Sequence, residues 1–300
     1  MTGNPMQYSV DALGLSGSVT TLLRDLIHEQ LGLMYDPSQL DQVADRLAPL
    51  VVARGLGSFL DYYYLLKYSP EPDEWLKVID ALAVQETYFW REIDQLRAVV
   101  TCIVPQLVEA LNGEPLRIWS IPCATGEEPL TIAMLLSEAG WFERAPIQLI
   151  ASDASPNAIA RARRGHYTRR SFRNLPLALR DKYFVEHEDS WSVIPTLQQR
   201  VSYDVVNLVS EAEVARHAAA PIVFCRNVFI YFSDRSIRRA LSVFERLMPS
   251  PGYLCVAAAE SLLRRTAMFE LQEHGGAFMY VKAEPMASRR VLAPIVEKAS

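Results

Sequence analysis

Two loops that follow strand-length apolar runs carry the acidic side chains best placed for ligand chemistry. The run 116–122 leads through a loop with one glycine, Gly126, to Glu127 and Glu128, and the run 147–152 ends next to Asp153. Open α/β sheets bind ligands at the carboxyl ends of their strands. The loop lacks the G-x-G-x-x-G pattern of pyrophosphate sites, and its carboxylates favour a cationic ligand.

Asp153 lies about 25 residues beyond Glu128, the position from which an acidic side chain accepts hydrogen bonds from a ribose diol. Alone, an Asp after a strand is more often an N-cap or a turn residue. Together with the glutamates of the first loop, Asp153 predicts a nucleoside site.

Two further segments bear on the same site. CRNVFIYF (residues 225–232) places Arg226 and Asn227 at the end of an apolar strand, with Tyr231 shortly after. VQETYFWRE (residues 84–92) has Thr87 and Arg91 four apart, a spacing that places them on one face of a helix. Each segment has a plainer interpretation. In the first, Arg226 and Asn227 only hold nearby loops in place. In the second, the aromatic residues are part of the core and Arg91 forms a surface ion pair.

Six arginines cluster around a predicted helix end. A charge run is usually a solvated face, but beside an active-site mouth it would attract an acidic partner. The five histidines show no metal-ligand spacing, and neither a Walker motif nor a G-x-S-x-G elbow occurs, so no metal is predicted. The clustered residues are Arg161, Arg163, Arg164, Arg169, Arg170 and Arg173.

Composition and charge narrow the class of protein. The 300 residues are 50% hydrophobic and 22% charged, which is typical of a folded globular protein of one large domain or two. The net charge of −5 argues against binding to nucleic acid. Residues 1–94 hold 6 basic and 14 acidic side chains, a net −8, and the remainder is at +3, so two regions with different electrostatic tasks are expected.

The four cysteines contain no C-x-x-C pair, which argues against a disulfide framework or a zinc site and predicts reduced, mostly buried thiols. No apolar stretch approaches the roughly 18 residues that cross a bilayer. The sequence therefore predicts a cytoplasmic protein without direct membrane insertion.

Periodicity predicts two kinds of architecture along the chain. Apolar residues recur at helical spacing from Ser18 to about Val99, which indicates a small helical bundle, and a second helix follows over 96–111. After the breaker NGEP (residues 112–115), five strand-length runs alternate with helices, which predicts a parallel sheet covered on both faces. The runs are 116–122, 147–152, 203–208, 222–225 and 253–259.

Four segments together resemble one family. QETYFWRE is similar to its NETxFFRE signature, IPCATGEEPLTIAMLL to its CSTGEEPYSIAM loop and helix, and SDASPNAIARARRGHY and FCRNVFIYF to its next two motifs. The family is that of the chemotaxis-type receptor methyltransferases, CheR-like, which esterify glutamate side chains on chemoreceptors with S-adenosylmethionine. The resemblance runs from about Leu22 to about Lys282, with the segments in the family's order.

The resemblance implies a fold of the α/β class: a small N-terminal all-α domain joined to a Rossmann-like methyltransferase domain with an inserted small antiparallel β-subdomain. The expected division is 18–95 for the helical domain, 96–114 for a linking helix and breaker, 115–285 for the methyltransferase domain and 286–300 for a tail. Residues 171–201, where Trp191, Val193 and Ile194 alternate, are the expected β-subdomain.

The resemblance also implies the roles of individual residues. Arg91 and Tyr231 would lie beside the transferred methyl group as catalytic residues, and S-adenosylhomocysteine would be the product. The partner implied is the cytoplasmic signalling region of a chemoreceptor, with a receptor tail peptide bound through the β-subdomain. The implied cofactor contacts are Gln85, Thr87, Arg91, Glu128, Asp153, Asn207, Leu208, Arg226 and Asn227.

The sequence departs from the family pattern at two places near the site. Gln85 stands where the signature has Asn, and Ala258 and Ala259 precede Glu260 where the family has His-Ser-Glu. The main hypothesis is an active protein-glutamate O-methyltransferase in chemosensory signalling. These departures keep open a non-catalytic regulator or scaffold that binds S-adenosylmethionine or S-adenosylhomocysteine. A methyltransferase for small molecules or nucleic acid is a third alternative.

Overall fold

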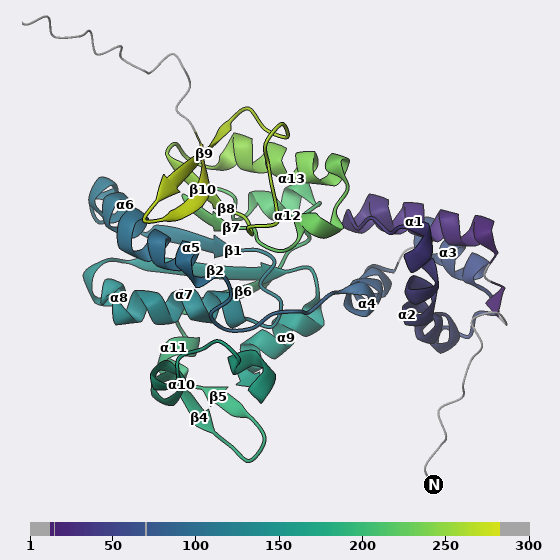
Figure 1. The fold of residues 1–300 in the computed structure, drawn as a ribbon. Coiled ribbons are helices and arrows are strands. Elements are labelled where there is room, and N and C mark those ends of the chain that lie inside the picture. Colours follow the sequence, from purple (N-terminus) through teal and green to yellow (C-terminus); the bar gives the residue numbers. More distant parts are fainter. Residues whose placement is uncertain (1–12, 15, 70, 283–300) are drawn as a thin grey trace, which may run out of the picture.

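A computed structural model describes residues 13–282 except 15 and 70, and Figure 1 shows a group of helices beside a larger sheet-containing unit. The helices of the first group are α1 (Gly17–Leu31), α2 (Leu40–Ala53), α3 (Phe59–Tyr68) and α4 (Pro72–Leu82), with a short 3-10 turn, η2 (Pro37–Gln39). Ile27, Leu47 and Phe59 are fully buried in its core. The predicted helical bundle is therefore confirmed.

The larger unit contains a seven-stranded sheet in the order β6-β2-β1-β7-β8-β10-β9. The first five of these strands pair in parallel, as the alternating pattern predicts. Predicted and observed strands overlap, although four of the five end earlier than predicted. The strands are β1 (Leu116–Ser120), β2 (Ile147–Asp153), β6 (Val201–Val205), β7 (Ile222–Phe224), β8 (Gly252–Cys255), β9 (Phe269–His274) and β10 (Ala277–Lys282).

The antiparallel hairpin β9–β10 corrects the expectation of a purely parallel sheet. Its turn is Gly275-Gly276, with φ angles of 58° and 80°, and two glycines with positive φ are the usual connection of a two-residue hairpin. The Gly-Gly pair is a readable hairpin signal that strand-length apolar runs alone do not reveal.

Alternate strand residues pack against helices on opposite faces of the sheet. Ile118 joins a core formed with α5 (Ile93–Ala98), η3 (Val99–Ile103), α6 (Val104–Leu111) and α7 (Glu127–Glu138). Trp119 joins the opposite core, with α12 (Glu211–Ala215) and α13 (Asp234–Leu247). The alternation is the period of two expected of strands buried on both faces.

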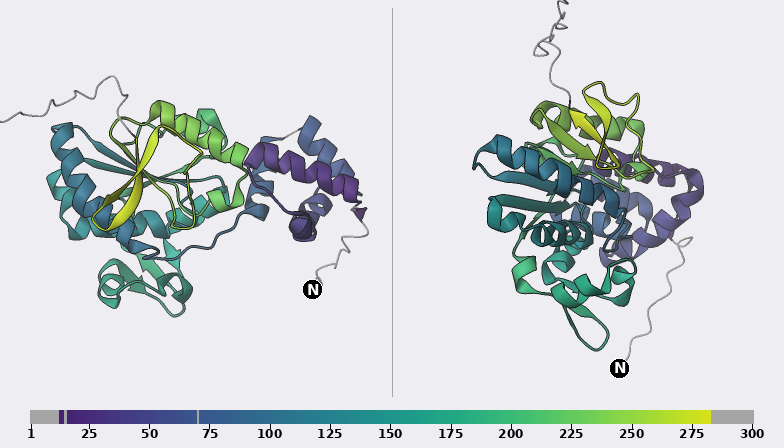
Figure 2. Two further views of the ribbon diagram at one scale, coloured as in Figure 1. Left: turned by 45° about the horizontal axis from the view of Figure 1, so that its top comes forward. Right: turned by 60° about the vertical axis from the view of Figure 1, so that its left-hand side comes forward.

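A small antiparallel sheet lies below the main one in Figure 2, left. It has the order β3-β5-β4, from β3 (His166–Tyr167), β4 (Phe184–Glu186) and β5 (Trp191–Val193). The predicted range 171–201 misses β3, because a two-residue strand leaves no periodic pattern. Between the strands lie η4 (Arg169–Phe172) and α10 (Leu177–Tyr183), and α11 (Pro195–Gln198) follows them.

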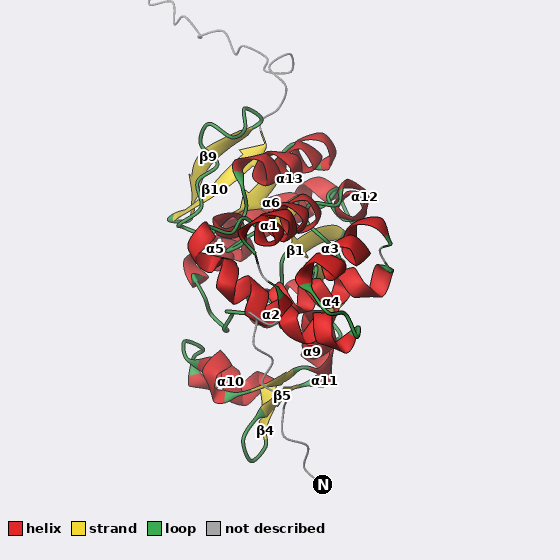
Figure 3. Ribbon diagram, turned by 90° about the vertical axis from the view of Figure 1, so that its right-hand side faces the viewer, coloured by secondary structure: helices red, strands yellow, loops and turns green. Residues whose placement is uncertain are grey.

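The end of α1 packs closely on the larger unit. Gly32 ends the helix with φ 76°, and a Cβ there would lie 2.7 Å from Val209 Cγ1. Leu33 forms a β-bridge with Phe232, and the backbone N–H of Met34 donates to the Tyr231 carbonyl at 2.8 Å. The helical unit is thus bound to the segment that carries Tyr231. Figure 3 shows the molecule with the helical unit facing the viewer.

Candidate functional site

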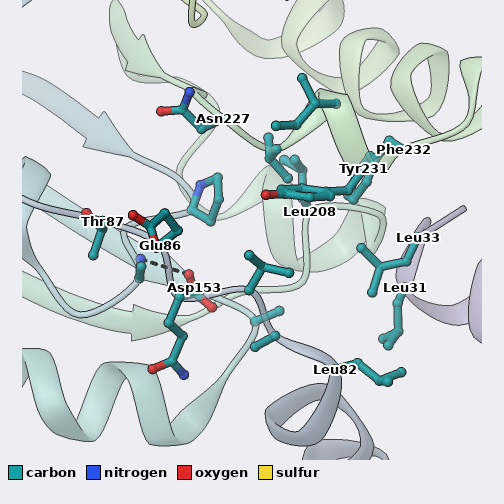
Figure 4. A pocket seen from close by; sticks show the side chains of 18 of the residues that line it. Leu31, Leu33, Leu82, Glu86, Thr87, Asp153, Leu208, Asn227, Tyr231 and Phe232 are labelled. Atoms are coloured by element: carbon teal, nitrogen blue, oxygen red, sulfur yellow. Dashed lines mark hydrogen bonds between the residues drawn. The ribbon is translucent and has the colours of Figure 1, made fainter. Parts of the chain in front are cut away.

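A cavity of about 390 Å³ lies where the helical unit meets the carboxyl ends of β1, β2, β6 and β7. This volume falls within the usual range of small-molecule sites. In Figure 4, Thr87 and Asn227 lie at one side, Leu31, Leu33 and Phe232 lie at the other, and Asp153 lies between them. The cavity is therefore built from both units.

The loop after β1 and the end of β2 are joined through Asp153. Its carboxylate accepts hydrogen bonds from the backbone N–H groups of Ala124 and Ser155, both at 2.9 Å. Ser155 caps the start of α9 (Pro156–Arg164), and Gly165 caps its end. Burial raises the pKa of Asp153 above its ordinary value, and the charge of Asp80 adds to the rise.

Glu128 forms one side of a buried ion-pair group. Arg226, with a side chain only 1% exposed, contacts Glu128 at 3.0 Å and Glu92 at 3.1 Å. The other Glu128 oxygen accepts from Ser120 Oγ at 2.8 Å. One guanidinium thus balances two carboxylates, one from the start of α7 and one from the segment before α5.

The two carboxylates respond differently to this arrangement. Burial raises the pKa of Glu128 above its ordinary value despite the opposing charge of Arg226. Although burial acts to raise it, Arg226 holds the pKa of Glu92 below its ordinary value. Arg226 lines the cavity, and its buried Nε has no hydrogen-bond partner among the described residues. That N–H is a donor available to a ligand carboxylate.

The segment 83–92 corrects the predicted helix. Residues 83–88 are irregular, and Trp90 and Glu92 have positive φ angles of 69° and 47°. Thr87 and Arg91 therefore share no helix face, although both line the cavity. The side chain of Glu92 contacts Arg226, Asn227 and the Ala258 backbone, and these distant contacts hold a conformation that local spacing cannot reveal.

The side chains of Arg91 and Gln85 both form hydrogen bonds within the protein. Arg91 donates to the Glu86 carbonyl at 2.8 Å and lies over the Tyr88 ring. Gln85 accepts from Arg161 Nη1 at 2.8 Å. Its side chain thus connects the segment to α9.

Asn207, Leu208 and Tyr231 line the remaining wall. The Asn207 side chain donates to the Gln30 carbonyl at 2.9 Å and accepts from Val209 N–H. Tyr231 is 36% exposed at the cavity mouth. The ten residues implied as cofactor contacts or catalytic residues all line this one cavity, although they come from segments up to 146 positions apart, Gln85 to Tyr231. Glu127 does not line it and instead accepts hydrogen bonds from Thr125 and Ser171.

Sequence patterns did not reveal two contributions to the site. The first is Glu260, a buried carboxylate that accepts from the backbone N–H groups of residues 227–230 and 257, at 2.7 to 3.4 Å. Its signals were its place shortly after a strand and its match to the Glu of the family's His-Ser-Glu, neither of which indicated these five hydrogen bonds. The second is the wall from the helical unit, for which the sequence offered no signal, and which includes Leu31, Met34, Tyr35, Gln42, Arg46 and Leu82.

Three further findings concern the described residues. The four cysteines are free, and three of them are buried. No group of His, Cys, Asp and Glu in the described part of the chain has the arrangement of a metal site. Within residues 13–282 as described, no helix is long and apolar enough to span a bilayer.

Two family models together match the helical unit and most of the larger unit. Residues 85–276 match the model of the CheR methyltransferase SAM-binding domain, and residues 21–83 match that of the CheR methyltransferase all-alpha domain. Chemotaxis protein methyltransferase 2 of Vibrio cholerae is 36% identical over 86% of this chain and 91% of that protein.

Two further relatives show how widely the match extends. The probable biofilm formation methyltransferase WspC of Pseudomonas putida is 33% identical over 89% of this chain, which spans 62% of that protein. The chemotaxis protein methyltransferase of Borreliella burgdorferi is 29% identical over 79% of this chain and 86% of its own.

Proposed function

The chain belongs to the CheR methyltransferase family and is an S-adenosylmethionine-dependent methyltransferase, and we propose that it esterifies glutamate side chains of a chemoreceptor. The observation that carries this proposal is the single cavity that gathers Arg91, Asp153, Arg226 and Tyr231 from distant segments. The acceptor is inferred from the family.

The cavity has the donors and acceptors that S-adenosylmethionine requires. Asp153, at the carboxyl end of β2, would accept hydrogen bonds from the ribose. The unpartnered Nε–H of Arg226 would meet the cofactor's carboxylate, and Glu128 would lie near its ammonium group. Thr87, Gln85, Asn207, Leu208 and Asn227 would complete the contacts.

The chemistry requires orientation more than proton transfer. When bound, S-adenosylmethionine supplies a methyl carbon that exchanges its bond to sulfur for a bond to the acceptor oxygen, leaving S-adenosylhomocysteine. A glutamate with a free pKa of about 4.3 is already ionised at neutral pH, so no general base is needed. Arg91 would hold this carboxylate through a charge-assisted hydrogen bond, and Tyr231 would orient it from the cavity mouth. Correct orientation contributes about 7 kcal/mol or more to such reactions.

The same proposal covers partner, location and domain division. β4 is an outer strand of the small sheet, and Val185 on it is 52% exposed, so a receptor tail peptide has an open edge on which to add a strand.

Since the acceptor is the cytoplasmic signalling region of a receptor, we place the enzyme in the cytoplasm. The proposed domains are 18–95 and 115–285, with 96–114 as the link.

A labelling experiment tests the proposal. The protein is incubated with methyl-labelled S-adenosylmethionine and the signalling regions of its own organism's receptors, and base-labile label is measured. We expect methyl ester in the wild type and a loss of at least 100-fold in kcat for Arg91→Ala, about 2.7 kcal/mol in the barrier.

The control for that experiment is Arg97→Ala, which removes an exposed arginine on α5 that does not line the cavity. If the wild type binds S-adenosylhomocysteine but forms no ester on any receptor, the glutamate-esterifying proposal is wrong. The regulator or scaffold hypothesis would then replace it.

A further inference from the structure

The outer face of α13 carries an unusual group of charges. The helix buries Ile237, Ala240, Leu241 and Phe244 against the sheet. Its first two turns expose three arginines at positions i, i+3 and i+4, a spacing that puts them on one side of the helix. We call Arg235, Arg238 and Arg239 the α13 arginine face.

These three arginines lack partners, whereas the arginines around them have partners. Among the described residues, none of the three guanidinium groups has a hydrogen-bond, ion-pair or ring partner. Arg246, further along the same helix, pairs with Glu211 at 2.6 Å, and Arg265 pairs with Asp234 at 2.8 Å. The α13 arginine face is therefore a concentration of uncompensated positive charge on a protein of net charge −5.

Helix stability does not explain this face. Like charges three and four residues apart repel each other and destabilise a helix. Positive charges in the first turns also oppose the helix dipole, whose amino-terminal end is positive. Three arginines at the start of α13 thus weaken the helix on two counts, which points to a role outside it.

The α13 arginine face lies next to the mouth of the cavity. Tyr231 lines the mouth, Ser233 caps α13, and Arg235 follows two residues later. The five residues from Arg235 to Arg239 advance only about 6 Å along the helix axis. The start of α13 also touches α1, where His28 Nε2 lies 2.7 Å from Ser233 Oγ, and Figures 1 and 2 both show the start of α13 meeting the end of α1.

The arginine cluster at residues 161–173 is less available for this task. Arg170 and Arg173 pair with Glu86 at 2.5 and 3.0 Å, and Arg161 is bound to Gln85. Arg163 donates to the Tyr203 carbonyl at 2.6 Å, so four of the six arginines of that cluster join segments of the chain. Since residues 1–94 hold 14 acidic side chains against 6 basic ones, an acidic acceptor would also be repelled by much of the helical unit.

We infer that the α13 arginine face docks the acidic stretch of the acceptor around its target glutamates, beside the cavity where methyl transfer occurs. This inference rests on the proposed function. Charge complementarity and continuity with the Tyr231 mouth identify the occupant. Each esterification removes one negative charge from the acceptor, so its affinity for the α13 arginine face falls as methylation proceeds.

The test compares two triple variants with the same change in net charge. R235Q/R238Q/R239Q removes the α13 arginine face. R117Q/R144Q/R200Q removes arginines at or just before β1, β2 and β6, at the amino ends of the strands and away from the cavity. Binding of an unmethylated receptor signalling region is measured in the presence of S-adenosylhomocysteine at about 0.02 M salt, where screening is weak.

We expect R235Q/R238Q/R239Q to raise the Kd for the acceptor at least tenfold, with kcat at saturating acceptor within twofold of wild type. The effect shrinks at about 0.5 M salt. An acceptor with its target glutamates replaced by Gln should bind the wild type and this variant almost equally.

Equal acceptor affinity in the two triple variants would overturn the inference. So would loss of binding to vesicles containing anionic lipid while acceptor affinity is unchanged, because the face would then recognise a membrane surface. Binding needs no turnover, so absence of methyl ester in the wild type contradicts the proposed function separately.

Discussion

At the scale of single residues, the site depends on the ion pairs and hydrogen bonds that its buried carboxylates form. Glu128 shares Arg226 with Glu92, whereas Glu260 is held by five backbone N–H groups. A buried acceptor is costly unless its hydrogen bonds are made. Glu260 meets this requirement by fixing the segment that leads to Tyr231, so it acts as a positioning residue.

Glu260→Gln tests that role. The amide NH₂ would face backbone N–H groups in place of an acceptor, so we expect the free energy of unfolding to fall by about 2 kcal/mol. Because the Tyr231 segment loosens, kcat should fall about tenfold while the Kd for S-adenosylhomocysteine changes less than threefold. Urea denaturation and steady-state kinetics measure the two effects, and an unchanged kcat in the folded variant would assign Glu260 a structural role only.

Glu74 provides a comparison away from the cavity. It is buried in the helical unit, where Arg54, Lys77 and Tyr62 donate to it. Although burial acts to raise it, these hydrogen bonds hold the pKa of Glu74 below its ordinary value. We expect Glu74→Gln to cost about 3 kcal/mol of unfolding free energy at neutral pH, with kcat unchanged.

The lowered pKa fixes the pH dependence of that difference. The unfolded chain takes up a proton at Glu74 below about pH 4.3, before the folded protein does. The advantage of wild type over Glu74→Gln should therefore be constant above about pH 5 and shrink as the pH falls further. Urea titrations at several pH values measure it, and a difference that grows on acidification would contradict the assignment.

At the scale of elements, the sequence predicted those helices and strands whose formation depends on nearby residues. The five parallel strands overlap the predicted apolar runs because the length and apolar content of a strand are local features of the sequence. The irregular segment 83–92 was missed because Glu92 is held by Arg226 and Ala258, far along the chain. Its aromatic spacing still resembles a helix, so periodicity alone gave the wrong element.

The end of α1 gives a prediction at this scale. Gly32→Ala would place a Cβ 2.7 Å from Val209 in a left-handed conformation. We expect a loss of about 2 kcal/mol of unfolding free energy and weaker binding of S-adenosylhomocysteine, because Leu31 and Leu33 line the cavity. Urea denaturation and calorimetry measure both.

Gly55→Ala is the matched control for that substitution, because Gly55 has φ 68° but a Cβ added there would meet no atom within 4 Å. It carries the same backbone penalty without the clash. Equal losses in the two variants would show that close packing at Gly32 contributes nothing.

At the scale of the whole molecule, the cavity lies between two units that the sequence analysis predicts as separate domains. α4 reaches the larger unit through Asp80, whose Oδ1 accepts from Ser155 Oγ at 2.5 Å. α1 reaches it through Asn207 and the bridge of Leu33 with Phe232. The division into two units was readable from a change of periodicity, but their shared wall depends on tertiary contacts that no local pattern encodes.

Ligand binding should therefore protect both units. We expect S-adenosylhomocysteine to slow amide hydrogen exchange at residues 31–46 as well as at 83–91 and around Asp153, since all three regions line the cavity. Stabilisation should reach about 2.7 kcal/mol at a ligand concentration of 100 times Kd. Protection confined to residues after Gln85 would show that the helical unit does not take part in binding.

The central claim is that this cavity holds the cofactor, and calorimetric titration with S-adenosylmethionine and S-adenosylhomocysteine tests it most directly. Wild type, Asp153→Ala and Asp189→Ala are compared; Asp189 is exposed between β4 and β5 and does not line the cavity. We predict that Asp153→Ala alone weakens binding by about 1.5 to 3 kcal/mol, roughly 10- to 150-fold. Wild-type affinity in Asp153→Ala, or no binding by the wild type, would contradict the account.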